Sequence, residues 1–170
     1  MLNHRVLLSI LDTYGIRGVA NKWFESYLTL RKQCVEIKSK KQGTSVSTTK
    51  EIIHGVPQGS TLGPILFLLY INDLPLNVLE SNIVLFADDT NLLITGDNLN
   101  TVQSRTNNVM QDIRSWFISN SSIVNAGKTL AISFHTTQNK IPAVPRVILE
   151  DREIPYNTET KFLGVYLNEI

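Results

Sequence analysis

The sequence predicts an α+β fold, because segments with helical and strand periodicity are mixed along the chain without a regular strand–helix alternation. The 170 residues include 42% hydrophobic side chains, which is enough for one domain with an ordinary core. Only 18% of the residues are charged and no low-complexity tract occurs, so the composition argues against intrinsic disorder.

Two short helices are predicted near the start of the chain. Leu7, Leu11 and Tyr14 recur at helical spacing, and Gly15 is a plausible C-terminal stop. A second apolar stripe at helical spacing follows, and its members are Val19, Trp23, Tyr27 and Leu30. We expect the aromatic side chains of this second helix to be core residues before base-stacking ones, and they are Trp23, Phe24 and Tyr27.

A β-hairpin, a loop and a helix are predicted next. The alternation from Gln33 to Lys38 and the Thr-, Val- and Ile-rich run from Ser45 to Ile53 indicate two strands, joined by a turn at 40–43. Gly55–Gly59 must be a loop, since it contains two glycines and a proline. Ser60 can cap the following helix and Pro64 fits its first turn. This helix is apolar nearly all round, so we expect it to be buried, and to end near 72–75.

The second half combines a hairpin, a long helix and short strands. Asp88 and Asp89 separate two β-prone runs, Ile83–Ala87 and Thr90–Thr95, by the spacing of a two-residue hairpin turn. An amphipathic helix is predicted from Leu99 to Phe117. Three further strands are expected, at Thr129–Phe134, Arg146–Leu149 and Lys161–Leu167.

Composition excludes several classes of protein. The net charge of +1 gives no global case for nucleic-acid binding, so such a case must come from a local patch. The single cysteine, Cys34, excludes an internal disulfide framework, and the three histidines share no zinc-ligand spacing. The longest apolar run, Ile65 to Ile71, is far shorter than the roughly 20 residues of a membrane-spanning helix. We expect an intracellular protein without a membrane partner, nuclear or cytoplasmic, and the sequence sets no oligomeric state.

Asp88 and Asp89 are the first candidates for chemistry. Two carboxylates about 5 Å apart repel by on the order of 3 kcal/mol at an effective dielectric of about 20, and a bound cation would offset that cost. Hard divalent cations such as Mg²⁺ prefer carboxylate oxygens. A second interpretation stays open, in which both residues only form a turn through bonds to nearby backbone.

The glycine-rich stretch Gly55–Gly63 is the second candidate. Glycines let the backbone approach a ligand closely, and the N-terminus of the following helix favours negative charge. The Gln58 amide can contact the edge of a base or a sugar. No Gly-Lys-Ser/Thr sequence follows, so this is not a Walker loop, and a loop that only turns the chain is the alternative.

Several strings in order carry a family resemblance. They include Gly55-Val-Pro-Gln-Gly-Ser-Thr-Leu-Gly-Pro-Ile-Leu-Phe67, Tyr70-Ile-Asn-Asp-Leu74 and Leu85-Phe-Ala-Asp-Asp-Thr90. Together they resemble the reverse transcriptase domain of non-LTR (LINE-type) retrotransposons. The segments before and after them, from Tyr14 to Val35 and from Trp116 to Val165, are similar to flanking motifs of that family.

The resemblance implies an architecture. It implies a right-hand polymerase in which this chain is a single truncated reverse transcriptase domain over 1–170, without a thumb. Residues 1–54 would connect fingers and palm. Residues 55–170 would form the palm, an antiparallel sheet with packed helices, together with a primer-grip hairpin.

The resemblance also implies an activity and its residues. The activity is RNA-directed DNA polymerisation, in which a DNA primer on an RNA template attacks a deoxynucleoside triphosphate with the help of Mg²⁺ or Mn²⁺. Asp88 would be a metal ligand and Asp89 a weaker partner, while Lys128 would neutralise or protonate the pyrophosphate. For Lys128 a solvated surface lysine is an equal alternative. Residues near the incoming nucleotide and templating base would be Pro57, Gln58 and Gly59, and those of the primer grip would be Lys161, Phe162, Leu163 and Gly164.

A basic segment is expected beside the first hairpin. Residues 31–41 contain one acidic residue, Glu36, and five basic residues, which are Arg31, Lys32, Lys38, Lys40 and Lys41. They would contact template phosphates, which makes affinity salt-dependent, or they would form a solvated hairpin face. Of these basic residues, we assign Arg31 to nucleotide or template binding.

One departure from the family limits the expected activity. The family's first catalytic carboxylate precedes its counterpart of Asn3-His4, and alignment on His4 places that carboxylate before Met1. Since two-metal chemistry needs carboxylates around both ions, we expect an incomplete metal site and an isolated chain that is inactive or nearly so. The alternative is a non-catalytic retroelement remnant that acts as a nucleic-acid-binding or protein-interaction module.

Overall fold

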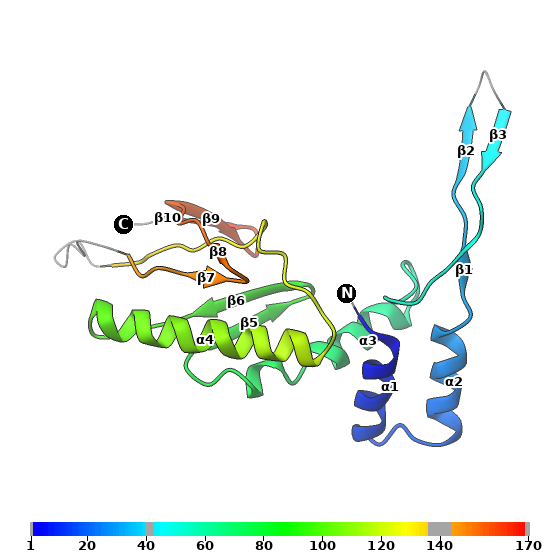
Figure 1. The fold of residues 1–170 in the computed structure, drawn as a ribbon, viewed down its shortest axis with the longest axis horizontal. Helices are drawn as coiled ribbons and strands as arrows, with labels where there is room; N and C mark the ends of the chain where they lie inside the picture. Colours follow the sequence, from blue (N-terminus) through cyan, green and yellow to red (C-terminus); the bar gives the residue numbers. More distant parts are fainter. Residues whose placement is uncertain (1, 40–42, 136–143, 169–170) are drawn as a thin grey trace. The chain divides into compact units, whose positions relative to one another are not determined.

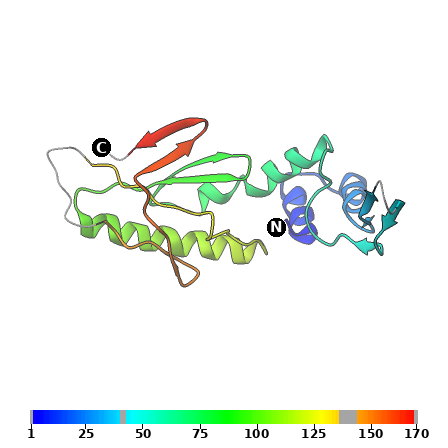
Figure 2. The same ribbon diagram turned by 90° about the horizontal axis from the view of Figure 1, so that it is seen from above.

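The computed structural model describes residues 2–39, 43–135 and 144–168 (Figures 1 and 2). The chain divides into a first unit, Met1–Asn72 with Asn120–Ser122, and a second unit, Asp73–Ser119 with Ile123–Ile170. Helices and two-stranded antiparallel sheets are mixed in both units, so the predicted α+β class is confirmed. In the described ranges, no helix has the length and apolar character needed to span a bilayer.

The first unit begins with two helices, as predicted. Helix α1 is His4–Thr13 and helix α2 is Val19–Leu28. The Asn3 side chain caps α1, because its oxygen accepts hydrogen bonds from the backbone N–H groups of Arg5 and Val6. Leu7 and Leu11 of α1 are fully buried, so this helix supplies much of the core of the unit.

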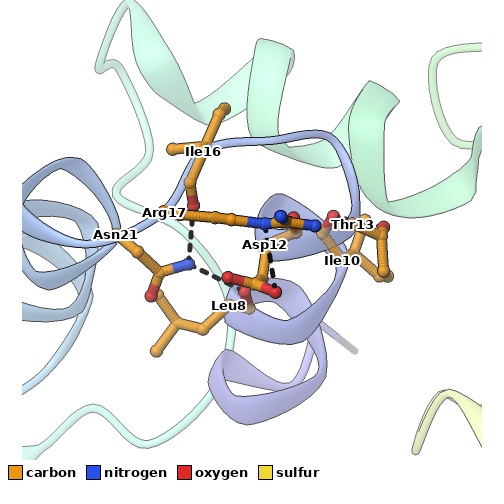
Figure 3. A network of polar contacts seen from close by, with 7 residues as sticks. All are labelled: Leu8, Ile10, Asp12, Thr13, Ile16, Arg17 and Asn21. Atoms are coloured by element: carbon orange, nitrogen blue, oxygen red, sulfur yellow. Dashed lines mark hydrogen bonds and ion pairs between the residues drawn. The ribbon is translucent and has the colours of Figure 1, made fainter.

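One side chain of α2 and one of the connecting turn bond the C-terminal half of α1 and the turn (Figure 3). The Asn21 amide of α2 donates hydrogen bonds to the carbonyl oxygens of Leu8 and Ile16, both at 3.0 Å. Arg17 Nε donates to the Asp12 carbonyl at 3.0 Å and lies 3.6 Å from the Asp12 carboxylate. Backbone carbonyls at the end of α1 and in the turn are satisfied in this way.

The expectation that Trp23, Phe24 and Tyr27 are core residues is wrong for Trp23 and is met only in part by the other two. Trp23 is 54% exposed, and Val19 and Leu30 are more exposed still. Phe24 and Tyr27 are half-buried, and Leu28 is the buried residue of α2. Among the described elements, α1 is the one that packs most closely on α2, so it covers one face and leaves the aromatic face open. Periodicity therefore identified the apolar stripe of α2, but it did not indicate which element of the fold would cover that stripe.

The predicted hairpin is present but in two pieces. Strands β1 (Lys32–Gln33) and β4 (Lys50–Glu51) pair, as do β2 (Glu36–Ser39) and β3 (Gly43–Val46). The expected continuous strand is interrupted at Val35, whose N–H and C=O both bond Ser47 at 2.9 Å. The expected turn falls largely on 40–42, and these residues, with Lys40 and Lys41, lie outside the described residues.

Helix α3 (Leu62–Ile71) follows, with the predicted end confirmed. Leu66, Tyr70 and Ile71 are buried, but Ile65 and Leu68 are 50% and 52% exposed. The expectation that the whole helix is buried is therefore wrong, because α1 covers only one side of it in the described unit. The Tyr70 hydroxyl donates to the Asn120 carbonyl, which ties residues 120–122 to the first unit.

The second unit is built on a long helix. A short 3-10 helix, η1 (Leu74–Leu76), leads into the hairpin of β5 (Asn82–Phe86) and β6 (Asp89–Leu93), and then into α4 (Leu99–Ser119). The predicted amphipathic face is confirmed, since the buried residues of α4 recur at helical spacing: Thr106, Val109, Ile113 and Trp116. Other buried apolar residues of this unit are Leu74, Val78, Val147, Leu149 and Ile154.

Two further hairpins complete the second unit. Strands β7 (Ile148–Leu149) and β8 (Arg152–Glu153) pair, as do β9 (Glu159–Phe162) and β10 (Val165–Asn168). Both central residues of each turn have positive φ, as type I′ turns require. The strand predicted at Thr129–Phe134 is wrong. That segment forms one isolated bridge between Ala131 and Tyr156, and burial raises the pKa of the Tyr156 hydroxyl.

The buried leucines of α1 give a test of the core. Replacing Leu11 by Ala should lower the free energy of unfolding by about 2–5 kcal/mol, because the change leaves a cavity. A urea denaturation midpoint measures this loss. Leu30→Ala is the matched control, since Leu30 is 83% exposed and should change stability by less than about 0.5 kcal/mol. Equal effects of the two substitutions would contradict the assigned core.

Candidate functional site

The two acidic residues lie at the turn between β5 and β6, but one position earlier than predicted. Phe86 pairs with Asp89, so the two-residue turn is Ala87-Asp88 and Asp89 is the first residue of β6. Ala87 has a φ of 50°, the left-handed conformation that a tight hairpin turn demands. The prediction of an Asp88-Asp89 turn is therefore wrong by one residue. Asp88 is at the tip of the hairpin and Asp89 is held by strand pairing.

The hairpin has one half-buried face and one exposed face. Leu85 pairs with Thr90 and Ile83 with Leu92, and these four residues are half-buried. Asp89 lies opposite Phe86 on the other face, and both are exposed. The expectation of a buried strand carrying the turn is therefore wrong for one of its two faces. Strand alternation gives Asp89 an accessible carboxylate.

Both carboxylates are available to a ligand. Asp88 and Asp89 are exposed, and within the described residues neither side chain makes an ion pair or a hydrogen bond. No third His, Cys, Asp or Glu joins them in the described part of the chain to form a larger metal-ligating group. Mg²⁺ commonly takes one or two protein carboxylates together with waters and substrate phosphates. Two adjacent carboxylates therefore fit such an ion.

The glycine-rich loop is anchored by the segment that enters α1. The Gly55 N–H donates to the Leu2 carbonyl at 2.7 Å, and His4 Nε2 lies 2.7 Å from the Gly55 carbonyl oxygen. Since a carbonyl oxygen only accepts, His4 Nε2 must carry the proton. His4 is buried, and an isolated bridge pairs its neighbour Asn3 with His54. Sequence reasoning missed this anchor, because nothing in the spacing of residues this far apart signals it.

The rest of the loop is shaped by its own backbone and by one serine. Gly59 has a φ of 77°, which favours glycine. The Ser60 hydroxyl donates to the Pro57 carbonyl at 2.8 Å and accepts from the Gly63 N–H at 3.0 Å, so the predicted capping role of Ser60 is confirmed. Gln58 is exposed, and in the part of the chain that the structure describes its side chain makes no hydrogen bond. Its amide is free to bind a ligand.

Other predicted site residues lie on turns and hairpins. Lys128 is exposed in a turn after α4, where its N–H donates to the Asn125 carbonyl at 3.0 Å. Lys161 lies on β9 with its ammonium group 5.7 Å from the centre of the Tyr166 ring on β10. Within the second unit as described, neither lysine pairs with Asp88 or Asp89.

The predicted residues of the two units are Arg31, Pro57, Gln58 and Gly59 in the first, and Asp88, Asp89, Lys128 and Lys161 to Gly164 in the second. Phe162 is half-buried, and Leu163 and Gly164 form the exposed β9–β10 turn. The hairpin predicted at Lys161–Val165 is thus confirmed as a structure.

Comparison with known proteins identifies the family. The family described as reverse transcriptase (RNA-dependent DNA polymerase) matches residues 2–167. A probable RNA-directed DNA polymerase from transposon X-element of Drosophila melanogaster is 30% identical over 85% of this chain. An RNA-directed DNA polymerase from mobile element jockey of the same species is 30% identical over 72% of it. A retrovirus-related Pol polyprotein from type-1 retrotransposable element R1 of Bradysia coprophila is 31% identical over 71% of it.

The matches cover 15%, 14% and 12% of these three relatives, so the chain spans a small part of their length. No solved structure matches the chain. The family match nevertheless covers nearly all of this sequence, including the acidic hairpin and the glycine-rich loop. The chain therefore belongs to the reverse transcriptase family of non-LTR retrotransposons, as its ordered motifs predicted.

Proposed function

We propose that this chain supplies the palm and a part of the fingers of an RNA-directed DNA polymerase. Residues 1–54 connect fingers and palm, and residues 55–170 form the palm with the primer-grip hairpin. The reaction joins the 3′-hydroxyl oxygen of a DNA primer to the α-phosphate of a deoxynucleoside triphosphate and releases pyrophosphate. An RNA template, which the family implies, selects the nucleotide.

The acidic hairpin is the observation that carries the proposal. Asp88 and Asp89 are adjacent, exposed and without partners in the described residues, inside a segment that matches the family. Reverse transcriptases depend on divalent metal in general, and these two carboxylates would hold Mg²⁺ or Mn²⁺ here. Such an ion, when bound, offsets the negative charge of the reacting phosphates. The hairpin would contribute two adjacent carboxylates, one on the turn and one on the strand.

Residues outside the hairpin would hold the substrates. Gln58, flanked by Pro57 and Gly59, has a free amide for the incoming nucleotide and the templating base. The exposed Lys128 ammonium would neutralise the pyrophosphate that leaves. The turn of the β9–β10 hairpin would grip the primer end, and Arg31 would contact the template.

Replacing the carboxylate at the hairpin tip tests the metal site. Asp88→Asn should weaken Mn²⁺ binding by at least about tenfold, because losses of this size accompany changes even to the neighbours of metal ligands. Asp89→Asn should have a smaller effect, since we assign it the weaker role. Titration of Mn²⁺ followed by electron paramagnetic resonance measures both.

Asp97→Asn is the matched control, because it removes the same charge from another exposed residue of the second unit. It should leave Mn²⁺ binding unchanged. If Asp88→Asn and Asp97→Asn both bind Mn²⁺ as the wild type does, the hairpin is only a turn. Salt-dependent RNA binding without any effect of metal would then favour a non-catalytic remnant.

The anchor between His4 and Gly55 is tested through the loop. His4→Phe leaves the Gly55 carbonyl without its donor, which should cost about 1–3 kcal/mol of local stability. Hydrogen exchange at the Gly55 amide should then accelerate by roughly 5–150-fold, as measured by NMR. His4→Gln, which keeps a donor, should restore part of the protection. Unchanged exchange in His4→Phe would show that the histidine does not hold the loop.

A further inference from the structure

Helix α2 carries two stacked aromatic rings on its open face, and the Arg31 guanidinium, three residues beyond the end of the helix, extends them to a column of three planar groups. The Trp23 and Tyr27 rings are nearly parallel, with 8° between their planes and 5.6 Å between their centres. The Arg31 guanidinium carbon lies 5.9 Å from the centre of the Tyr27 ring. Phe24 packs edge-on against Trp23, with 5.1 Å between the ring centres. The column therefore begins at the Trp23 indole on α2 and ends at the Arg31 cation beyond the end of the helix.

Burial does not explain this column. Trp23 is more than half exposed, so much of its apolar surface gains nothing from folding. The Tyr27 hydroxyl is buried without a hydrogen-bond partner among the described residues, which costs about 1–3 kcal/mol. The rings fit better as a surface for a planar ligand, since a base gains about 1–3 kcal/mol from stacking on an aromatic side chain.

The positive net charge of the first unit favours a polyanion as that ligand. The first unit contains nine Lys and Arg against four Asp and Glu, a net charge of +5. The second unit contains seven against eleven, a net charge of −4. The overall charge of +1 thus hides a strong asymmetry. Beyond Arg31 the chain enters β1 at Lys32, and β4, which pairs with β1, begins at Lys50.

We infer that the column of Trp23, Tyr27 and Arg31 is a stacking site for unpaired bases of single-stranded RNA. Lys32, the next residue after Arg31, would neutralise a backbone phosphate beside it, whereas Lys50 pairs with Gln33 on the other face of the β1–β4 ladder. This inference rests on the proposed function, because the RNA is the template, and it assigns the single-stranded template a contact on α2. Stacking of this kind is sequence-tolerant, since every base has a π-face, whereas duplex RNA keeps its bases stacked on one another.

Removing the indole tests the stacking site. Trp23→Ala should weaken binding of a short unstructured RNA about tenfold, measured by fluorescence anisotropy of the labelled RNA. The salt dependence of binding should stay the same, because no phosphate contact is lost. Lys32→Gln should instead reduce the slope of log affinity against log salt by about one. Trp23→Phe should keep most of the affinity, because a phenyl ring also stacks on a base, and an unchanged urea midpoint of Trp23→Ala shows that its loss of affinity is not a loss of folding.

Two readouts separate Trp23 from other aromatic residues. RNA should quench tryptophan emission in the wild type and not in Trp23→Ala, because the remaining tryptophan, Trp116, is buried. Phe134→Ala is the matched control. Phe134 is an aromatic residue of the second unit that is 50% exposed, and its loss should leave RNA affinity unchanged.

Three results would overturn the inference. Equal affinity of Trp23→Ala and the wild type, with salt-dependent binding in both, would remove the stacking site and leave template binding elsewhere on the chain. Absence of any RNA binding by the wild type at low salt would count against the proposed function as well. Self-association of the wild type that Trp23→Ala abolishes, measured by sedimentation, would assign the face to a second copy of this chain.

Discussion

The anchoring of Gly55 by the entry to α1 is the constraint on which the first unit depends. Two short contacts, from His4 Nε2 to the Gly55 carbonyl and from the Gly55 N–H to the Leu2 carbonyl, join segments more than fifty residues apart. Helix α1 packs against both α2 and α3. The N-terminal segment that holds the loop therefore also positions these two helices. Any glycine has wide conformational freedom in the unfolded chain. In the folded chain Gly55 has a positive φ, and the anchor fixes its backbone at the start of the loop. Any ligand of Gln58 therefore meets a loop whose position is set from outside it.

The second unit depends instead on local pairing. Its strands form two-stranded hairpins in the described ranges, and a single hairpin is only marginally stable in water. Packing on α4 supplies the missing stability for β7, and buried residues of α4 and of the C-terminal segment share one core. The acidic turn gains order from β5–β6 pairing and from the tight turn at Ala87. The metal site proposed on this hairpin would have two adjacent carboxylates but little burial, so its affinity would come from the carboxylates and not from exclusion of water.

The sequence predicted where most helices and hairpins lie, but not which of their faces other elements cover. Apolar periodicity and the Gly15 stop located α1 and α2, and the same pattern located α4, because these signals are local. Exposure of Trp23 and Ile65 could not be predicted, since a stripe does not specify which element covers it. The shift of the acidic turn came from Ala87, a residue without a turn signature that takes the left-handed position. Family motifs located Asp88 and Gln58, but the His4–Gly55 contact, which is purely tertiary, had no local signal.

Under the proposed function, the opposite charges of the two units explain how a nearly neutral chain would bind a polyanionic nucleic acid. A net charge of +1 over 170 residues gave no reason to expect nucleic-acid binding. Exposed charges interact over about 10 Å at 0.1 M salt, so a bound strand responds to the charges near it and not to the sum. The acidic hairpin by itself would repel phosphate, and a divalent cation on Asp88 and Asp89 would reverse that local sign. Under the proposed function, the basic first unit would attract nucleic acid without metal, whereas the acidic hairpin of the second unit would accept phosphate only together with an ion.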